Sequence, residues 1–191
     1  MKRFKLGNDF IALTVVLFVI LSLQALGAFR GVNEWVNLAL PMIDTPLMNF
    51  LTALGGDVFL ALFVAFALLT EWRESGRVSR NTLVFILAVA VGLAAVGALK
   101  FLFAEPRPRP YGPGIGGYAF PSGHTFRAAI IAAYASDRWK RYAPIAWAYA
   151  VGIALTRLFL HYHWFSDVLF SLLFAPWLYL LLKSLLGVDS E

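Results

Sequence analysis

Long apolar runs alternate with short polar segments along this chain. Six of the runs reach or approach the roughly 20 residues that an α-helix needs to cross the hydrocarbon core of a bilayer. They cover about residues 10–29, 47–70, 82–103, 122–136, 143–161 and 166–186. The fourth run is short and begins inside a polar motif. The pattern predicts an all-α integral membrane protein, built as a bundle of six transmembrane helices.

Two short segments interrupt this layout. Residues 30–41 carry Trp35 among alternating small apolar clusters, which favours a helix along the outer interface rather than across the membrane. Gly55 and Gly56 precede Asp57 inside the second run, where an unpaired carboxylate is costly. We predict a break at the two glycines, with Asp57 capping the helix that follows. A catalytic role for Asp57 is the alternative.

Composition agrees with a membrane environment. Hydrophobic residues make up 60% of the chain and charged residues only 14%, and the mean hydropathy is +0.73. These values lie well outside the range of soluble proteins. The 191 residues contain no repeat and no long linker, which predicts a single domain over residues 1–191. The absence of cysteine excludes a disulfide or a thiolate metal site.

Basic residues divide unequally between the two sides of the six-span layout. Ten fall on one side, which the positive-inside rule makes cytoplasmic: Lys2, Arg3, Lys5, Arg73, Arg77, Arg80, Arg138, Lys140, Arg141 and Lys183. Both termini are therefore expected in the cytoplasm, and the protein in the plasma (inner) membrane. The other six fall at or near the opposite face: Arg30, Lys100, Arg107, Arg109, Arg127 and Arg157. A bound anion would explain positive charge on that disfavoured side.

The N-terminal run permits a second interpretation, as a secretory signal peptide. Basic residues precede it, and it ends with small residues between Ala25 and Ala28. The run is longer than the roughly 7 to 15 apolar residues of a signal peptide, which favours a first transmembrane helix. The later helices keep their orientation under either interpretation.

The first polar patch places two cations at a chain break. Lys100 lies near the end of the third run, and Arg107 follows it on a segment with Pro106, Pro108 and Pro110, which cannot continue a helix. Two long cationic side chains can converge here on one ligand. Taken alone, the patch also fits a snorkelling lysine and a basic loop at the headgroups.

The second patch has the form of a loop that enters a helix. Pro121 and Ser122 precede Gly123, His124 and an apolar run. Ser122 can cap that helix while its first backbone N–H groups face an anion. Gly123 permits a close approach of the backbone. An ordinary capped helix, with His124 at the interface, is the alternative.

The third patch pairs an imidazole with a carboxylate. His163 and Asp167 are four residues apart, so on a helix they share one face, and the carboxylate can accept one ring N–H while the other nitrogen stays free. An oriented histidine is a competent nucleophile. Arg157, six residues earlier, can reach the same place. The pair is also a common metal-ligand pattern, but the surrounding cations would repel a divalent ion, so we expect no metal.

In order and spacing, the patches resemble the motifs of the type 2 phosphatidic acid phosphatase superfamily. That superfamily includes lipid phosphate phosphatases and acid phosphatases, and it is related to vanadium haloperoxidases. Its motifs are Lys, six residues, Arg-Pro; Pro-Ser-Gly-His; and Ser-Arg, five residues, His, three residues, Asp. They match Lys100 to Pro108, Pro121 to His124, and Arg157 with His163 and Asp167, while Thr156 stands where serine is usual. The motif region spans residues 100–167.

The resemblance implies a phosphohistidine mechanism without a cofactor. His163 would attack phosphorus, Asp167 would hold its tautomer, and His124 would protonate the leaving oxygen and then activate water. The phosphate oxygens would be held by five further residues, namely Lys100, Arg107, Ser122, Gly123 and Arg157.

Three further polar residues near this face stay outside the predicted catalytic set. His161 is two residues from His163 and therefore on a different face of a helix, so we interpret it as interfacial. Arg109 and Arg127 either position anionic headgroups or serve as ordinary headgroup anchors.

The leading hypothesis is an integral-membrane phosphatase that hydrolyses a lipid phosphomonoester or diphosphate on the extracytoplasmic face. Undecaprenyl diphosphate, phosphatidylglycerol phosphate and phosphatidic acid are the candidate substrates, and the bilayer is the expected partner, with no nucleic acid. A lipid phosphotransferase with the same intermediate is a close rival. A vanadate-dependent haloperoxidase and a non-catalytic lipid transporter or structural membrane protein are the more distant alternatives.

Overall fold

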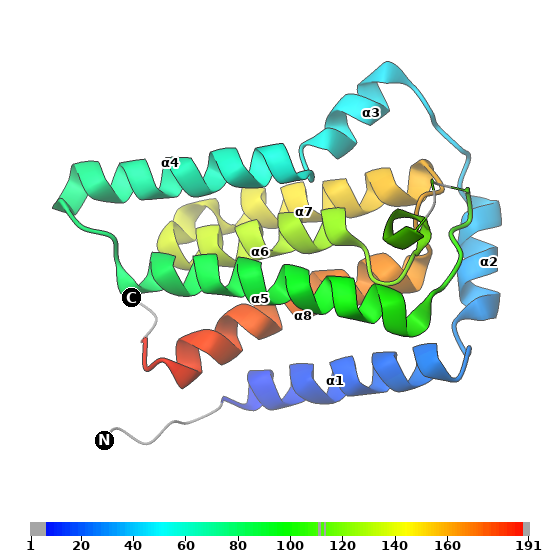
Figure 1. Cartoon of the computed structure of the whole chain (residues 1–191), viewed down its shortest axis with the longest axis horizontal. Helices are drawn as coiled ribbons and strands as arrows, with labels where there is room; N and C mark the ends of the chain where they lie inside the picture. Colours follow the sequence, from blue (N-terminus) through cyan, green and yellow to red (C-terminus); the bar gives the residue numbers. More distant parts are fainter. Residues whose placement is uncertain (1–6, 111, 113, 189–191) are drawn as a thin grey trace.

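The computed structural model describes residues 7–110, 112 and 114–188, and helices make up most of these ranges (Figure 1). The elements in chain order are α1 (Asn8–Ala25), α2 (Arg30–Ala39), α3 (Pro46–Ala53), α4 (Asp57–Ser75), α5 (Arg80–Phe103), η1 (Gly114–Gly117), α6 (Gly123–Arg138), η2 (Lys140–Tyr142), α7 (Ala143–Phe159) and α8 (Phe165–Leu185). The described part contains no strand, only one isolated bridge between Pro106 and Tyr118. The all-α prediction is therefore confirmed.

Six membrane spans are not confirmed. Among the described residues, three segments are long and apolar enough to cross a membrane: α5, η2 with α7, and α8. Two bent pairs, α1 with α2 and α3 with α4, raise the number to five if each pair is one span. The predicted fourth span is α6, which has only 16 residues.

The short helix α6 forms the centre of the bundle. It contacts α4, α5, α7 and α8, and it lies among them in Figure 1. Every residue from Thr125 to Ala135 except Arg127 is buried. Many of these residues are alanines, which let the neighbouring helices approach closely. An apolar run of this kind is therefore a protein core rather than a lipid-facing surface.

A glycine on α5 is required for one of these close approaches. A Cβ atom at Gly92 would lie 2.0 Å from Cζ of Phe126 on α6. The Phe126 ring is fully buried and packs against Phe174 of α8, with ring centroids 5.7 Å apart. Gly92 thus sets the separation of α5 and α6.

Polar residues close the end of the bundle where α4 meets α5. Glu71 accepts hydrogen bonds from the Ser79 and Thr82 hydroxyls, each across 2.7 Å. Asp137 of α6 accepts bonds from Asn81 and from Lys183 of α8. Helices α4, α5, α6 and α8 are therefore tied together at this end.

The α1–α2 and α3–α4 junctions agree with the predicted interruptions. Helix α2 is bent by 90° from α1, the direction expected of a helix along an interface. Helix α3 is bent by 43° from α4, with Gly55 and Gly56 between them, so the predicted break is confirmed. The cap position belongs to Gly56 instead of Asp57, which is the first residue of α4.

Candidate active site

The three polar patches come from four helix ends that meet at one end of the bundle, at the right in Figure 1. Lys100 is on the last turn of α5, and Ser122 caps α6. Arg157 is on the last turn of α7, and Asp167 is on the first turn of α8. His163 lies in the turn between α7 and α8. The fold thus brings residues far apart in sequence to one place.

Asp167 orients the His163 imidazole. Nδ1 of His163 lies 3.0 Å from Oδ2 of Asp167, and both side chains are at most 1% exposed. The same Oδ2 accepts the backbone N–H of Trp164 across 2.8 Å. Since Asp167 accepts at Nδ1, the ring carries its proton there and leaves the Nε2 lone pair available.

The predicted common helix face is wrong for this pair. His163 precedes α8, which begins at Phe165. His161, with a φ of +53°, lies in the turn after α7. Asp167 reaches back from the third residue of α8 to the turn, as acidic residues in a first helical turn commonly do.

Arg107 covers the free nitrogen of His163. Its NH1 atom lies 3.1 Å from Nε2 of His163 and donates to the carbonyl of Tyr162 across 2.6 Å. Its Nε donates to the carbonyl of Gly116 across 2.9 Å. These contacts hold a planar guanidinium beside Nε2, and a guanidinium in this position can bind a phosphate oxygen.

The start of α6 supplies neutral donors and fixes the distance to α8. The Ser122 side chain caps the helix by accepting the N–H of Thr125, and its backbone N–H donates to the Asp167 carbonyl across 3.3 Å. Gly123 is the first residue of the helix, where backbone N–H groups have no partner inside the helix. The positive end of α6 therefore faces the site.

His124 lies on the first turn of α6, under the break between α3 and α4. A Cβ atom at Gly56 would lie 3.9 Å from Nε2 of His124, and one at Gly55 would lie 3.2 Å from the His124 carbonyl oxygen. Glycine at position 55 permits this close approach to α6, whereas the distance at position 56 is an ordinary van der Waals contact. His124 is half-buried, whereas His163 is fully enclosed.

Two further cations border the site. Lys100 is buried, and its ammonium donates to the carbonyls of Tyr118 and Ala119 in the loop before α6. Arg157 is also buried, donates to the Thr52 hydroxyl across 2.9 Å, and lies over the Tyr162 ring at 4.8 Å. Both cations are therefore held by side chains and carbonyls of the surrounding helices and loops.

Burial and neighbouring charge disfavour protonation of His163. Removal from water lowers its pKa well below the usual range, and the charges of Arg107 and Arg157 lower it further. A neutral imidazole with a proton on Nδ1 is the form that can attack an electrophile through Nε2.

The other residues singled out from the sequence lie beside the site in contacts of their own. His161 contacts the carbonyl of Leu40 through Nε2 at 3.1 Å. Arg109 forms an ion pair of 2.8 Å with Asp44. Arg127 is paired with Asp57 at the start of α4.

The hydroxyl of Thr156 is hydrogen-bonded within its own helix. It donates to the carbonyl of Ile153, one turn back in α7, across 2.7 Å. The Thr156 side chain therefore contributes a hydrogen bond within α7, the helix that carries Arg157.

Glu105 is one residue of this region that the sequence did not single out. It lies between Lys100 and Arg107, and its side chain contacts that of Asp167. A carboxylate inside a cationic motif was the available signal.

No group of three His, Asp or Glu side chains suited to holding a metal ion occurs among residues 7–110, 112 and 114–188.

Comparisons with known proteins agree with this architecture. The sequence model of the PAP2 superfamily matches residues 81–187. A solved structure described as the first transmembrane PAP2 type phosphatidylglycerolphosphate phosphatase, from Bacillus subtilis, has a TM-score of 0.78 at 20% identity. The match covers 96% of this chain and 98% of that one. No curated protein matches the chain. The shared fold and the apolar helices make the chain a multi-pass integral membrane protein.

Proposed function

The chain belongs to the PAP2 superfamily, and we propose that it is an integral-membrane phosphatase that hydrolyses a lipid phosphomonoester or diphosphate through a phosphohistidine. The geometry of His163 carries the proposal. Its Nδ1 is held by Asp167 at 3.0 Å, while Nε2 faces the Arg107 guanidinium at 3.1 Å. A phosphate that replaces this arginine contact would bring phosphorus to the nucleophilic nitrogen.

In the first chemical step, Nε2 of His163 attacks phosphorus and the bond from phosphorus to the leaving oxygen breaks. The leaving group departs as an alcohol or a lipid monophosphate after His124 gives it a proton. Asp167 stabilises the imidazolium that forms, because its carboxylate accepts the Nδ1 proton. Such acid catalysis typically contributes about 100 to 10,000-fold.

In the second step, water attacks the phosphohistidine and the P–N bond breaks. His124 takes a proton from the water, which restores its acid form, and His163 becomes neutral again. Inorganic phosphate is the product. All of these proton transfers use side chains of this chain, so the proposed mechanism is independent of a metal.

The cations provide the electrostatic part of catalysis. Lys100, Arg107 and Arg157 surround His163 with positive charge. The N–H of Gly123 and the Ser122 cap add neutral donors at the end of α6. Together these groups would hold the non-bridging oxygens, whose charge must be balanced during in-line transfer.

The proposed site faces the extracytoplasmic side of the plasma membrane, with both termini in the cytoplasm. The distribution of basic residues supports this orientation. Seven of the ten predicted cytoplasmic cations belong to the described residues, and they lie around the helix ends opposite the site: Arg73, Arg77, Arg80, Arg138, Lys140, Arg141 and Lys183. Lys2, Arg3 and Lys5 lie outside the described residues.

A substrate with a hydrocarbon tail suits this placement, because the headgroup can reach the bundle end while the tail stays in lipid. Undecaprenyl diphosphate, phosphatidylglycerol phosphate and phosphatidic acid remain the proposed candidates. The Bacillus subtilis protein of similar fold is described as a phosphatidylglycerolphosphate phosphatase, which favours phosphatidylglycerol phosphate as one of the candidates.

Phosphate release from the three lipids by purified protein in detergent with EDTA tests the proposal. We expect turnover by the wild type and its loss in His163→Ala and His124→Ala. His161→Asn is the matched control and keeps activity, since asparagine tolerates the positive φ of this position. Equal activity in all variants would overturn the mechanism. EDTA-sensitive turnover would show a metal requirement, and label transferred to lipid would identify a phosphotransferase.

A further inference from the structure

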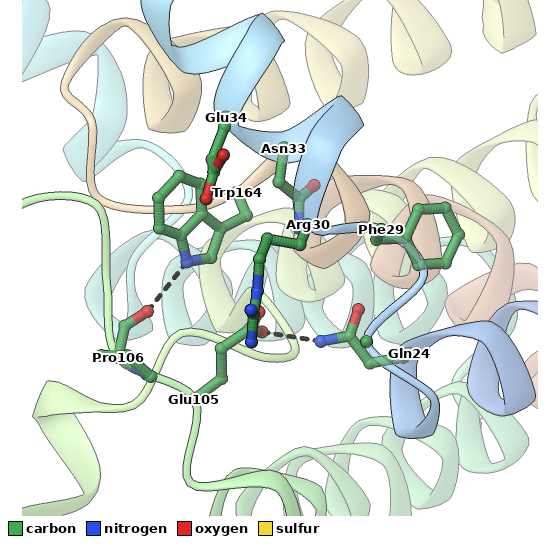
Figure 2. A pocket seen from close by; sticks show the side chains of 9 residues that line it. Gln24, Phe29, Arg30, Asn33, Glu34, Glu105, Pro106 and Trp164 are labelled. Carbon is green, nitrogen blue, oxygen red and sulfur yellow. Dashed lines mark hydrogen bonds between the residues drawn. The ribbon is translucent and has the colours of Figure 1, made fainter.

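A second carboxyl group lies behind the His163–Asp167 pair, and the phosphoryl-transfer steps do not use it. Glu105 follows α5, and its side chain is in hydrogen-bonding contact with that of Asp167. On its other side, Nε2 of Gln24 from α1 donates to Oε2 of Glu105 across 2.8 Å. Figure 2 shows this bond, at the edge of a cavity of about 290 Å³.

The two oxygens of Asp167 have different surroundings. Oδ2 lies against Nδ1 of His163 and the N–H of Trp164. Oδ1 is fully buried, and apart from the Glu105 carboxyl no described group is placed to donate a hydrogen bond to it. Because Oδ2 is already engaged, we assign the contact with Glu105 to Oδ1. A buried carboxylate oxygen without a donor would be costly.

Two carboxyl groups in contact, Asp167 fully buried and Glu105 half-buried, favour holding one proton between them, since two adjacent negative charges repel. The proton belongs on Glu105, because two N–H groups favour the charged form of Asp167. Burial also raises the pKa of Glu105 above its usual value.

The charged groups around the pair agree with this assignment. Burial and a charge on Glu105 would oppose the ionised form of Asp167, whereas Lys100, Arg107 and the N–H of Trp164 favour it, so a proton on Glu105 removes one of the two opposing effects. On the far side, Arg30 and Glu34 of α2 line the cavity with Glu105 (Figure 2). No ion pair between Glu105 and a cation is present among the described residues.

We propose that Glu105 is a positioning residue that stays protonated and donates a hydrogen bond to Oδ1 of Asp167. This bond fixes the Asp167 carboxylate so that Oδ2 faces Nδ1 of His163. The proton remains on Glu105 throughout turnover, and Gln24 holds the other Glu105 oxygen. The role rests on the proposed function, because it serves His163 as the nucleophile.

Infrared spectroscopy tests the proton directly. At neutral pH the wild type should show the carbonyl-stretching band of a protonated carboxylic acid. Glu105→Gln should lose the band, whereas Glu34→Gln, which changes an exposed carboxylate of the same cavity, should keep it. Absence of the band from the wild type, or its survival in Glu105→Gln, would overturn the proposal.

Kinetics test the positioning role. Glutamine can donate the same bond, so Glu105→Gln should keep kcat within about 3-fold, while Glu105→Ala should lose about 10-fold or more. Wild-type kcat should fall at alkaline pH as Glu105 ionises, and Glu105→Gln should lack that fall. Equal loss in both variants would overturn the proposal. If the wild type releases no phosphate from any lipid, the proposed function fails, while the infrared result still decides where the proton lies.

Discussion

The backbone N–H of Ser122 donates to the backbone carbonyl of Asp167 across 3.3 Å. This bond joins the start of α6 to the start of α8. One helix carries His124, the proposed acid, and the other carries the carboxylate that orients His163. Because both helix ends are buried at this contact, the two halves of the proposed reaction are held at a fixed separation.

Asp167→Asn should lower kcat by about 1,000 to 10,000-fold with little effect on folding. An amide can keep the packing, but it does not stabilise an imidazolium and can select the wrong tautomer, as in serine-protease triads. Phosphate release and thermal unfolding in detergent check this result. The control is Asp44→Asn, which removes an exposed carboxylate that is paired with Arg109. A drop of less than 10-fold in Asp167→Asn would remove Asp167 from the mechanism.

His163 should remain neutral well below pH 6.5. Its pKa is lowered by burial and by neighbouring cations, so protonation opposes folding. The stability that the neutral ring contributes is fully present above its unfolded pKa of about 6.5 and is lost as pH falls below it.

The chain has three histidines, so ¹⁵N-imidazole NMR with single substitutions can assign each ring. In the ligand-free protein at pH 6, His163 should show one protonated nitrogen, Nδ1. A titration midpoint at or above 6.5 for this ring would contradict the account of its environment.

Arg107→Lys should reduce kcat/KM by about 10 to 100-fold. Lysine keeps the charge but loses the planar fork that contacts Nε2 of His163, the Tyr162 carbonyl and the Gly116 carbonyl. Loss of hydrogen bonds from a charged group is worth about 1.5 to 3 kcal/mol. Arg109→Lys is the matched control, because its pair with Asp44 is solvent-accessible and water screens the interaction. If Arg107→Lys lowers kcat/KM no more than Arg109→Lys does, the positive charge at position 107 matters and the guanidinium shape does not.

Gly92→Ala should destabilise the bundle, because the added Cβ would lie 2.0 Å from the buried Phe126 ring. Overpacking of this kind costs about 1 to 3 kcal/mol. Gly97→Ala on the same helix should be neutral or stabilising, since its nearest atom, Cδ1 of Ile115, is 3.9 Å away. The midpoint of thermal unfolding in detergent distinguishes the Gly92→Ala variant from the Gly97→Ala variant. A Gly92→Ala protein as stable as the wild type would show that α5 and α6 can move apart freely.

The sequence allowed most of the candidate site to be located, because the chemistry restricts which residue types can occupy the motifs. His124 and His163 were assigned from patterns that do not depend on helix packing. Helix α6 was harder to interpret, since apolar composition does not distinguish a protein core from a lipid-facing surface. Its burial depends on neighbours that are distant in the chain.

The turn before α8 and the position of Glu105 also escaped sequence reasoning. A spacing of four residues fits a helix face, yet the chain turns at His161 and leaves His163 outside α8. Glu105 lies inside the first motif, but its contacts come from Gln24 on α1 and Asp167 on α8, which are distant in sequence. Tertiary contacts of this kind carry no local periodic pattern.

Trapping of the phosphorylated enzyme tests the central claim most directly. Protein mixed with a phosphate-labelled lipid and quenched under alkaline conditions, which preserve phosphohistidine, can be digested and sequenced by mass spectrometry. We predict a phosphoryl group on His163 in the wild type and none in His163→Ala. A phosphoryl group on His124, or efficient turnover without any phosphohistidine, would contradict the assignment of His163 as the nucleophile.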